Sequence, residues 1–439
     1  MARIAIVGGG ISGLCTALAL SDHELTVLEA GPQLGGKLQS EHVNGAVLEA
    51  AANGLLNGEP SVGRLVERLG LESQVILATE GERYVFFQGS MRAVPTSPPA
   101  MLTSNFLSLC GRVRLLTEPF RASGPSDEPI AEFARRRLGD EVLTKLVSPM
   151  VSGIHAGDTE QLSMEACFPK IKHLEQEHGS LLAGLRKQTS MESPGKLMSF
   201  KGGFRTLIQA LSQQLGDSVV LNAPCQALRR SGSGWQLHWG ENDRTFDAVV
   251  LACGAVASSD LLAPLSTDAA DAFRAIPSAA VGVVALVLPT GAWTPPSGFG
   301  CLVPDLESSP PILGVLFSSN IFPSHAPEGT AIMRVILGGT RDPQAIQATD
   351  EELLMRAIQG LESLLGKLPT PCATRIHRYP SAIPQYTMGH LDRVRSVRTL
   401  EAQENGLFFT GNHLDGVAVK DCIRNAEETA SRVKLELSR

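Results

Sequence analysis

The chain opens with a strand, a glycine-rich turn and a helix whose order restricts the fold more than any other feature. Residues 3–7 form a short apolar run, and Gly8-Gly9-Gly10-Ile11-Ser12-Gly13 follows it directly. The apolar residues 14–20 predict a helix, and a second strand is expected to end at Glu29. Such glycines bring the backbone close to a pyrophosphate at the positive end of the helix, and the acid can bind an adenosine ribose. This order predicts a dinucleotide-binding α/β domain.

A second glycine-rich segment indicates which dinucleotide is bound. Gly31-Pro32-Gln33-Leu34-Gly35-Gly36-Lys37 nearly matches a phosphate-binding P-loop, but Leu38 stands where that loop needs Ser or Thr for magnesium. The P-loop interpretation is therefore rejected. A glycine pair after the acidic strand is instead associated with FAD-binding oxidases and desaturases of the amine-oxidase type. We therefore expect FAD rather than NAD.

Composition and charge exclude several classes of protein. A chain of 439 residues is long for one core, so two or three lobes are expected. The net charge of −7 argues against a nucleic-acid partner, which normally requires a basic stripe. The eight cysteines include no C-x-x-C pair, which predicts mostly buried thiols in a reducing compartment, with neither a disulfide framework nor a metal site. We expect no secretory signal and no apolar run of the ~20 residues that a membrane span needs.

The pattern along the chain indicates that the dinucleotide domain is built from distant pieces. Apolar runs at residues 247–254 and 406–412 predict further buried strands, and residues 280–340 are rich in strand and turn signals. We therefore expect an α/β fold with a Rossmann-like FAD-binding domain of discontinuous segments and a mixed β-sheet substrate domain. The expected bounds are 1–76, 197–264 and 400–439 for the first domain, 77–91 and 265–399 for the second, and 92–196 for a helical insert.

Apolar residues recur at roughly helical spacing within this insert. They are Met101, Leu102, Phe106, Leu107, Leu109, Val113 and Leu116. A helix of this kind can face a protein core or lie in the headgroup layer of a membrane. The pattern by itself favours the core-facing interpretation.

Three motifs make the chain resemble the protoporphyrinogen oxidase family. The first is Ser152-Gly153-Ile154-His155-Ala156-Gly157-Asp158, followed by Leu162-Ser163. The second is Ile383-Pro384-Gln385-Tyr386-Thr387-Met388-Gly389-His390. The third is Gly416-Val417-Ala418-Val419, followed by Asp421-Cys422-Ile423. They occur in register from residue 3 to about residue 430, so the resemblance covers nearly the whole chain.

The resemblance implies an FAD enzyme of haem biosynthesis that oxidises protoporphyrinogen IX to protoporphyrin IX. FAD would accept a hydride from a bridging methylene carbon, and dioxygen would reoxidise it. The resemblance also implies that the helical insert binds a membrane, and hence a cytoplasmic protein attached peripherally to the inner membrane face. It also allows a homodimer.

Two alternatives remain open at this stage. A coproporphyrinogen III oxidase of the coproporphyrin-dependent haem route shares the same motifs, and its substrate's four propionates would favour a more cationic cavity. A noncatalytic binder on the same fold, as in Rab GDP-dissociation inhibitors, is disfavoured by the retained Gly35-Gly36 pair and by the C-terminal motif.

The resemblance implies which residues bind substrate and cofactor, and it implies no certain catalytic residue because the flavin carries the chemistry. Arg92 would bind a propionate, although by itself it could equally be a solvated loop arginine. Leu302, Leu316 and Ile336 would enclose the ring, and Gly153 would leave room for it; ordinary strand core is the alternative. The cofactor residues would be Gly8, Gly9, Gly10, Ile11, Ser12, Gly13, Glu29, Ala30, Gly36, Lys37, Asn53, Gly54, Cys225, Asn412, Val417, Ala418 and Val419.

The chain departs from the family pattern at three places. Glu49-Ala50-Ala51-Ala52-Asn53-Gly54 lacks the glycine and proline that the family carries under the flavin. His155 occupies a position that is usually aromatic, where it could act as a base or simply pack. His413 is expected near the flavin, where it is unusual.

Overall fold

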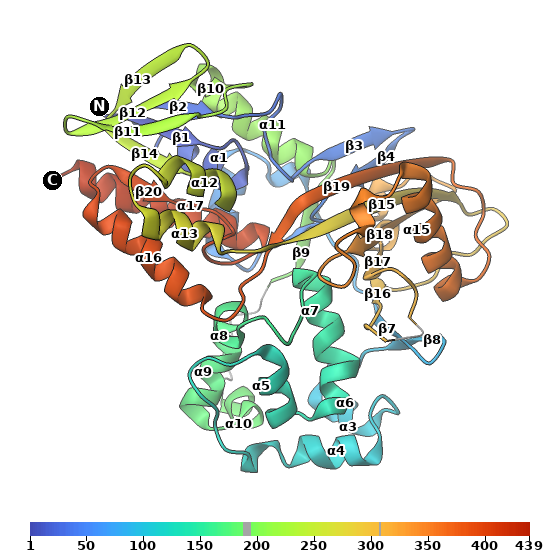
Figure 1. The fold of residues 1–439 in the computed structure, drawn as a ribbon. Helices are drawn as coiled ribbons and strands as arrows, with labels where there is room; N and C mark the ends of the chain where they lie inside the picture. The colour runs from blue at the N-terminus through green and yellow to red at the C-terminus, as the bar shows by residue number, and fades with distance from the viewer. Residues whose placement is uncertain (188–194, 307–308) are drawn as a thin grey trace.

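A five-stranded parallel sheet is assembled from segments far apart in the sequence. The computed structural model describes residues 1–187, 195–306 and 309–439 (Figure 1). The sheet has the order β10-β2-β1-β14-β20, and every neighbouring pair is parallel. Its strands are β10 (Val219–Val220), β2 (Glu24–Leu28), β1 (Arg3–Val7), β14 (Ala248–Leu251) and β20 (Leu407–Phe409). The first strand of the chain therefore lies at the centre of the sheet.

Helices cover both faces of this sheet because its strands are apolar on both sides. In β1, Ile4 and Ile6 pack against one helical layer, whereas Ala5 and Val7 pack against the opposite layer. The first layer holds α1 (Ile11–Ala19), α2 (Pro60–Arg68), α11 (Phe204–Leu215) and α17 (Val419–Leu437). The second holds α12 (Ala255–Leu262), α13 (Thr267–Arg274), α16 (His390–Gln403) and the small sheet of β11 (Ala227–Ser231), β12 (Gly234–Trp239) and β13 (Asn242–Phe246).

A second, seven-stranded sheet lies beside the first (Figure 1). Its order is β19 (Ala373–Pro384), β15 (Ser278–Pro289), β18 (Thr330–Gly338), β17 (Gly314–Phe317), β16 (Gly300–Leu302), β7 (Arg83–Phe87) and β8 (Ser90–Ala93). The sheet is mixed, because β16 and β7 are parallel while the other neighbours are antiparallel. These two sheets confirm the expected α/β class with a mixed second sheet.

Alternation along the strands gives the seven-stranded sheet two different faces. Val335 and Leu337 of β18 pack against Leu353 and Ala357 of helix α15 (Asp350–Leu365). Arg334 and the other even-numbered residues of β18 therefore point to the opposite face. The remaining strands are β3 (Ser40–Val43), β4 (Ala46–Glu49), β5 (Leu55–Leu56), β6 (Val75–Leu77) and β9 (Leu197–Phe200), and the short helix α14 (Ser318–Ile321) follows β17.

A helical lobe follows β8 in the chain and forms the lower part of the molecule in Figure 1. Its helices are α3 (Pro98–Thr103), α4 (Leu109–Leu116), α5 (Ile130–Arg137), α6 (Asp140–Val142), α7 (Ser148–His155), α8 (Met164–Cys167), α9 (Pro169–His178) and α10 (Leu181–Lys187). Residues 188–194 of the expected insert 92–196, and residues 307–308 of the expected substrate domain, lie outside the described residues. None of the helices in the described part of the chain is long and apolar enough to cross a bilayer.

The cysteines differ in exposure more than the sequence predicts. All eight are free thiols. Cys15, Cys301 and Cys422 are buried, whereas Cys110 and Cys372 are exposed. The expectation of mostly buried thiols is therefore correct for only part of the set.

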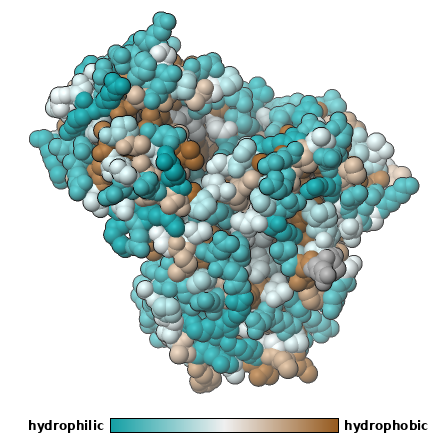
Figure 2. Space-filling view, viewed as in Figure 1, coloured by the Kyte–Doolittle hydropathy of each residue, from teal (hydrophilic) through white to brown (hydrophobic). Residues whose placement is uncertain are grey.

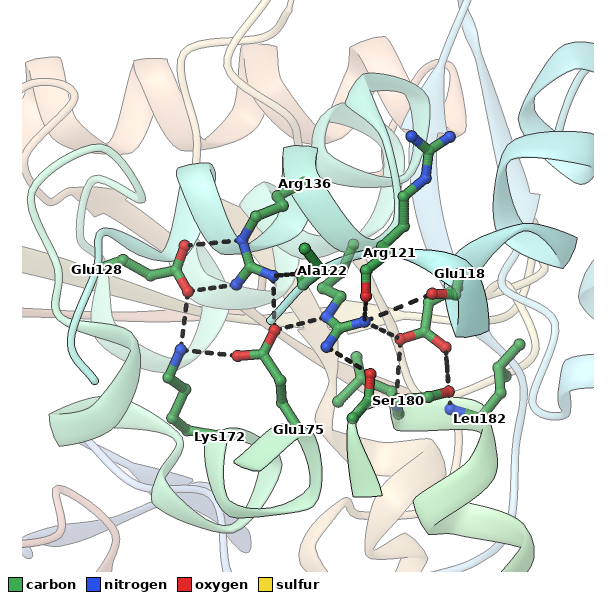
Figure 3. A network of polar contacts seen from close by, with 12 residues as sticks. Glu118, Arg121, Ala122, Glu128, Arg136, Lys172, Glu175, Ser180 and Leu182 are labelled. Atoms are coloured by element: carbon green, nitrogen blue, oxygen red, sulfur yellow. Dashed lines mark hydrogen bonds and ion pairs between the residues drawn. The ribbon is translucent and has the colours of Figure 1, made fainter. Parts of the chain in front are cut away.

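Buried charges hold the helical lobe together (Figure 3). Arg137 on α5 has no exposed side-chain surface, and its guanidinium donates to Glu175 on α9 at 2.6 Å and to Glu118 at 3.2 Å. Glu118 also accepts from the backbone amide of Leu181 at the start of α10. Further side chains of the network are those of Arg136, Lys172, Glu128 and Ser180. Because each buried charge has partners of opposite sign, the network ties three helices together without an unpaired charge.

The pKa of Glu175 shows how strongly this network favours the ionised carboxylate. Burial by itself would raise this pKa, but hydrogen bonds from Arg136, Lys172 and Arg137 outweigh burial and lower the pKa to about 2. The unfolded chain would titrate near the ordinary value of 4.5. Ionised Glu175 therefore stabilises the lobe fully above about pH 4.5, and this contribution is lost as the pH falls towards 2.

We predict that R137M lowers the free energy of unfolding by about 3–5 kcal/mol, because it leaves two buried carboxylates short of a cation. The measurement is denaturant unfolding followed by circular dichroism at pH 7. R64M is the control, since Arg64 pairs with Glu427 on the surface and its loss is expected to change stability little. Equal stability of R137M and the unmodified protein would contradict the structural role of the network.

Candidate active site

A cavity of about 800 Å³ lies where the glycine turns, the carboxyl ends of the parallel strands and the seven-stranded sheet meet. One end is formed by the segments after β1, β2 and β14, which is where open α/β sheets bind their ligands. The other end is formed by side chains of the seven-stranded sheet and by α7 of the helical lobe. The volume lies in the range of cavities that hold cofactor-sized molecules.

Close packing explains why the first turn is built from glycines. A Cβ at Gly13 would lie 1.9 Å from the carbonyl oxygen of Gly8, so only glycine lets α1 approach β1 this closely. Gly8 itself has a φ of +115°. Gly10 differs from both, because a Cβ there would meet no protein atom within 4 Å and would project into open space. The turn is therefore tightly packed against the protein at Gly13 and open to the cavity at Gly10, as a site for a diphosphate requires.

Glu29 fixes the two glycine turns relative to each other. Its carboxylate accepts hydrogen bonds from the backbone amides of Gly9 at 2.7 Å and Gly31 at 2.8 Å. It follows β2 directly and lines the cavity. The role in ribose binding that the sequence suggests for Glu29 is thus combined with a role in holding the turns, and the ribose contact itself stays a prediction.

Two helix N-termini meet the cavity without a side chain to cap them. α1 begins after Gly10 and α17 after Ala418, and neither has a side-chain cap. Ile11 and Ser12 of the first helix and Val419 of the second line the cavity. The first amides of a helix have no partner inside the helix and carry partial positive charge. The site therefore fits an anionic diphosphate and an electron-rich ring system.

Lys37 connects the cofactor loop to the seven-stranded sheet. Its ammonium donates to the carbonyl oxygen of Ala382 on β19 at 2.5 Å, and burial lowers its pKa. His413 lies in the same cavity wall, where burial and then the charge of Lys37 lower its pKa to about 3. His413 is therefore neutral at physiological pH and cannot supply a charge to a ligand.

Most residues predicted to hold the cofactor line this one cavity. These are Gly8, Gly10, Ile11, Ser12, Glu29, Ala30, Gly36, Lys37, Asn53, Gly54, Cys225, Asn412, Val417, Ala418 and Val419. Gly9 and Gly13 do not line it; they pack behind the turn against Leu34, Glu29 and Gly8. Burial raises the pKa of Cys225 to about 12, so this thiol stays protonated and is no nucleophile.

Four of the residues predicted to bind substrate, Arg92, Leu302, Leu316 and Ile336, share one face of the seven-stranded sheet, whereas Gly153 lies on α7. The register places Ile336, Gly314, Leu302, Val85 and Arg92 in one row across β18, β17, β16, β7 and β8. Residues directly opposite each other on neighbouring strands point to the same face. This is the face that carries Arg334, opposite to α15. The row therefore runs from the cavity towards the helical lobe.

The residues predicted to bind substrate lie at different distances from the cavity. Ile336 lines it, as do Leu316 and Gly153. Leu302 lies directly beside Gly153, because a Cβ on that glycine would be 2.6 Å from Leu302 Cδ2. Arg92 lies two strands beyond Leu302, about 10 Å away, and donates to Gln88 at 2.9 Å. Arg92 is thus on a strand rather than a loop and stands outside the cavity wall.

His155 is part of the packing behind the cavity. It is 2% exposed, and the centroids of its ring and of the Phe168 ring lie 5.8 Å apart in an edge-on arrangement. Burial lowers the pKa of His155 to about 4. Its neighbours Ile154 and Ala156 line the cavity, whereas His155 does not. The structure therefore favours the packing interpretation of His155 over a role as a base.

Several wall residues carry no recognisable signal in the sequence. Val281, Val283 and Ile383 belong to strands whose apolar pattern indicates only burial, and Ala51 lies in the segment that departs from the family pattern. Arg334 lies behind this wall and is different, because it is a charged residue within the otherwise apolar run of β18. That interruption is the signal that could have drawn attention to it.

These features together define a dinucleotide-binding oxidoreductase with a second, substrate-side sheet. The family model of flavin containing amine oxidoreductases matches residues 11–434, and the chain belongs to this family. FAD is accordingly its cofactor, which agrees with the glycine turns and the uncapped helix N-termini.

Comparisons with individual proteins indicate which flavin oxidoreductases the chain resembles. The chain is 32% identical to protoporphyrinogen oxidase of Homo sapiens, over 98% of both chains. It is 28% identical to coproporphyrinogen III oxidase of Bacillus subtilis, over 98% of this chain and 97% of that protein. A crystal structure from Exiguobacterium sp. 255-15, of a protein proposed to be a protoporphyrinogen oxidase, has a TM-score of 0.88 at 25% identity and covers 100% of this chain and 99% of that one. The resemblance to the protoporphyrinogen oxidase family is confirmed.

We predict that G10A lowers FAD affinity at least tenfold without destabilising the apoprotein. The added methyl group meets no protein atom and enters the space open to the diphosphate, and Gly10 has an ordinary φ of −75°. The measurement is FAD titration by fluorescence together with the melting temperature of the apoprotein. G63A on α2 is the control, because its Cβ is also unobstructed but lies away from the cavity and should leave FAD binding unchanged. Unchanged FAD affinity of G10A would place the diphosphate elsewhere.

Proposed function

We propose that this chain oxidises protoporphyrinogen IX to protoporphyrin IX as a step of haem synthesis. The observation that carries the proposal is that a dinucleotide turn and an apolar sheet face line the same cavity. When bound, FAD accepts a hydride from a methylene bridge of the macrocycle and passes the electrons to dioxygen. The relatives with named porphyrinogen substrates support the same reaction class.

The charge of the cavity supports protoporphyrinogen over coproporphyrinogen. Among the lining residues that the structure describes, Lys37 is the only Lys or Arg, and its ammonium is held by Ala382. Coproporphyrinogen carries four propionates, which would each need a cation or access to water. Protoporphyrinogen carries two and has more apolar surface to bury. Relatives of both kinds exist, so coproporphyrinogen oxidation is the second candidate.

In this proposal the chain's own residues position the ring and exclude water. Leu316 and Ile336 form an apolar wall on the sheet side, and Gly153 leaves room on the side of α7. Leu302 continues the wall beyond Gly153. An apolar enclosure suits a substrate whose core carries no charge, and it needs no acid–base pair in the protein.

Arg92 would bind a propionate at the far end of the row. It points to the same sheet face as Leu302 and Ile336 and lies about two strand spacings beyond Leu302. A propionate arm that extends from an enclosed ring could reach this guanidinium, whose planar fork suits a carboxylate. The proposal therefore orients the ring with one carboxylate directed towards the helical lobe.

The test is to give anaerobically prepared protoporphyrinogen IX and coproporphyrinogen III separately to the FAD-loaded protein in air and to follow porphyrin fluorescence. We expect kcat/KM to be at least tenfold higher for protoporphyrinogen. A preference for coproporphyrinogen would support the second candidate. Turnover of neither substrate by a protein that holds FAD would overturn the porphyrinogen proposal.

The same assay tests Arg92. R92M should raise KM for the preferred substrate about tenfold or more, since a charge-assisted contact would be lost, and R92K should recover part of it. R356M is the control, because Arg356 lies on α15, the helix that packs against the opposite sheet face, and pairs there with Asp342. An unchanged KM in R92M would remove Arg92 from the substrate site.

The outer face of α4 supports attachment to a membrane surface. Leu109 is 76% exposed, Phe120 just beyond the helix is 87% exposed, and Val113 and Leu116 are exposed between them. Figure 2 shows apolar residues gathered at the lower end of the molecule, where α4 lies in Figure 1. Clustered apolar side chains of this size rarely face water without a partner. We therefore propose that α4 lies in the headgroup layer of the inner membrane face. A poorly soluble substrate would then reach the active site directly from the membrane.

The stripe predicted from sequence is thus divided between two environments. Met101, Phe106 and Leu107 are buried in the lobe, whereas Leu109, Val113 and Leu116 face outward. The core-facing interpretation is therefore correct for the buried residues, and the membrane interpretation stays a prediction for the exposed ones.

We predict that L109S combined with F120S reduces binding to phospholipid vesicles at least fivefold, because it removes two of the largest exposed apolar groups from this face. The measurement is co-flotation of the FAD-loaded protein with vesicles. L435S is the control, since Leu435 is 59% exposed at the far end of α17. Equal flotation of the double variant and the control would contradict membrane docking through α4.

A further inference from the structure

Arg334 is a fully buried cation directly behind the cavity wall. It sits in the middle of β18 and is 1% exposed. Its guanidinium donates to the side-chain oxygen of Asn53 at 3.0 Å and to the backbone carbonyl of Ala51. Ala51 and Asn53 both line the cavity. The guanidinium therefore touches the back of the segment that would face the flavin.

No carboxylate among the described residues forms an ion pair with Arg334, and the two groups that accept its hydrogen bonds are neutral. Glu49 is the acid whose charge acts on it, and this carboxyl is held by Ser40 at 2.8 Å and by the amide of Phe204 at 3.0 Å. Burial raises the pKa of Glu49 to about 7, so at neutral pH it carries only part of a charge. The positive charge of Arg334 is therefore not neutralised by contact with any carboxylate in the described part of the chain.

Arg334 remains charged in spite of its burial. Desolvation lowers its pKa to about 10, which still leaves the guanidinium protonated at physiological pH. Burying such a cation without a carboxylate is costly, and Asn53 and Ala51 stabilise it only through dipoles. A cation that is buried beside a cavity without a carboxylate partner indicates that it stabilises a group bound inside the cavity.

We propose that Arg334 is a positioning residue of the flavin site: it holds the Ala51–Asn53 wall in place and supplies the positive charge that makes bound FAD easier to reduce. Two-electron reduction of FAD with uptake of one proton leaves a negative charge on the reduced ring. A fixed cation behind the wall stabilises that product more than the neutral oxidised ring. The inference rests on the FAD part of the proposed function and not on the identity of the substrate.

Two variants separate the charge of Arg334 from its hydrogen bonds. R334Q keeps a donor towards Ala51 or Asn53 but removes the charge, whereas R334K keeps the charge on a shorter reach. R341M is the matched control, because Arg341 is a half-buried arginine of the same domain that donates to the carbonyls of Val303 and Ile312, away from the cavity.

The measurement is the midpoint potential of bound FAD, from slow reduction with xanthine and xanthine oxidase against a reference dye, without any porphyrinogen. We expect R334Q to lower the equilibrium constant for reduction at least tenfold, which is about 30 mV for two electrons. R334K should lie close to the unmodified protein, and R341M should not change. Equal potentials in R334Q and R334K would overturn the role of the charge.

A variant that loses FAD has no measurable midpoint potential. For such a variant, the amount of FAD that stays bound is the readout. Loss of FAD from R334Q but not from R334K supports the proposal, because R334Q lacks the positive charge that R334K keeps. Loss from both, with normal FAD binding in R341M, would show that the guanidinium only packs the wall and would overturn the electrostatic role. Because no substrate is used, either result leaves the porphyrinogen assay to be decided independently.

Discussion

The approach of α1 to β1 is the constraint on which the rest of this structure depends. It is so close that a side chain at position 13 would collide with the carbonyl of Gly8. This contact aims the N-terminus of α1 at the cavity, and the Glu29 carboxylate then fixes the following loop against the first turn through the amides of Gly9 and Gly31. A diphosphate site results from backbone geometry, with no basic side chain in the turn itself.

The second half of the cavity depends on the two-faced seven-stranded sheet. One face is covered by α15, so its side chains form an ordinary core. The other face supplies Ile336 to the cavity and Arg334 to the wall behind it. Lys37 connects to the same sheet through Ala382. The two sheets thus meet through a few polar contacts around an apolar space, which suits a cofactor on one side and an uncharged ring on the other.

The helical lobe is stabilised by buried charges. It must stay folded while α4 presents apolar side chains outward, so its small apolar core is supplemented by a buried network of charges centred on Arg137 and Glu175. Such a network specifies how the helices meet, because each charge is satisfied in one arrangement only. The lobe also contributes Gly153 to the cavity, so its orientation bears on access to the site.

The sequence by itself determined the dinucleotide turn, the class of fold and most residues of the cofactor wall, because glycine spacing and apolar period are local consequences of backbone geometry. It could not determine which strand residues face the cavity, since the pattern of a buried strand is the same on both faces. Ile336 and Val335 look alike in sequence, and only the sheet register separates them. Arg334 and the exposed part of α4 likewise acquire their meaning only when distant segments pack around them or leave them uncovered.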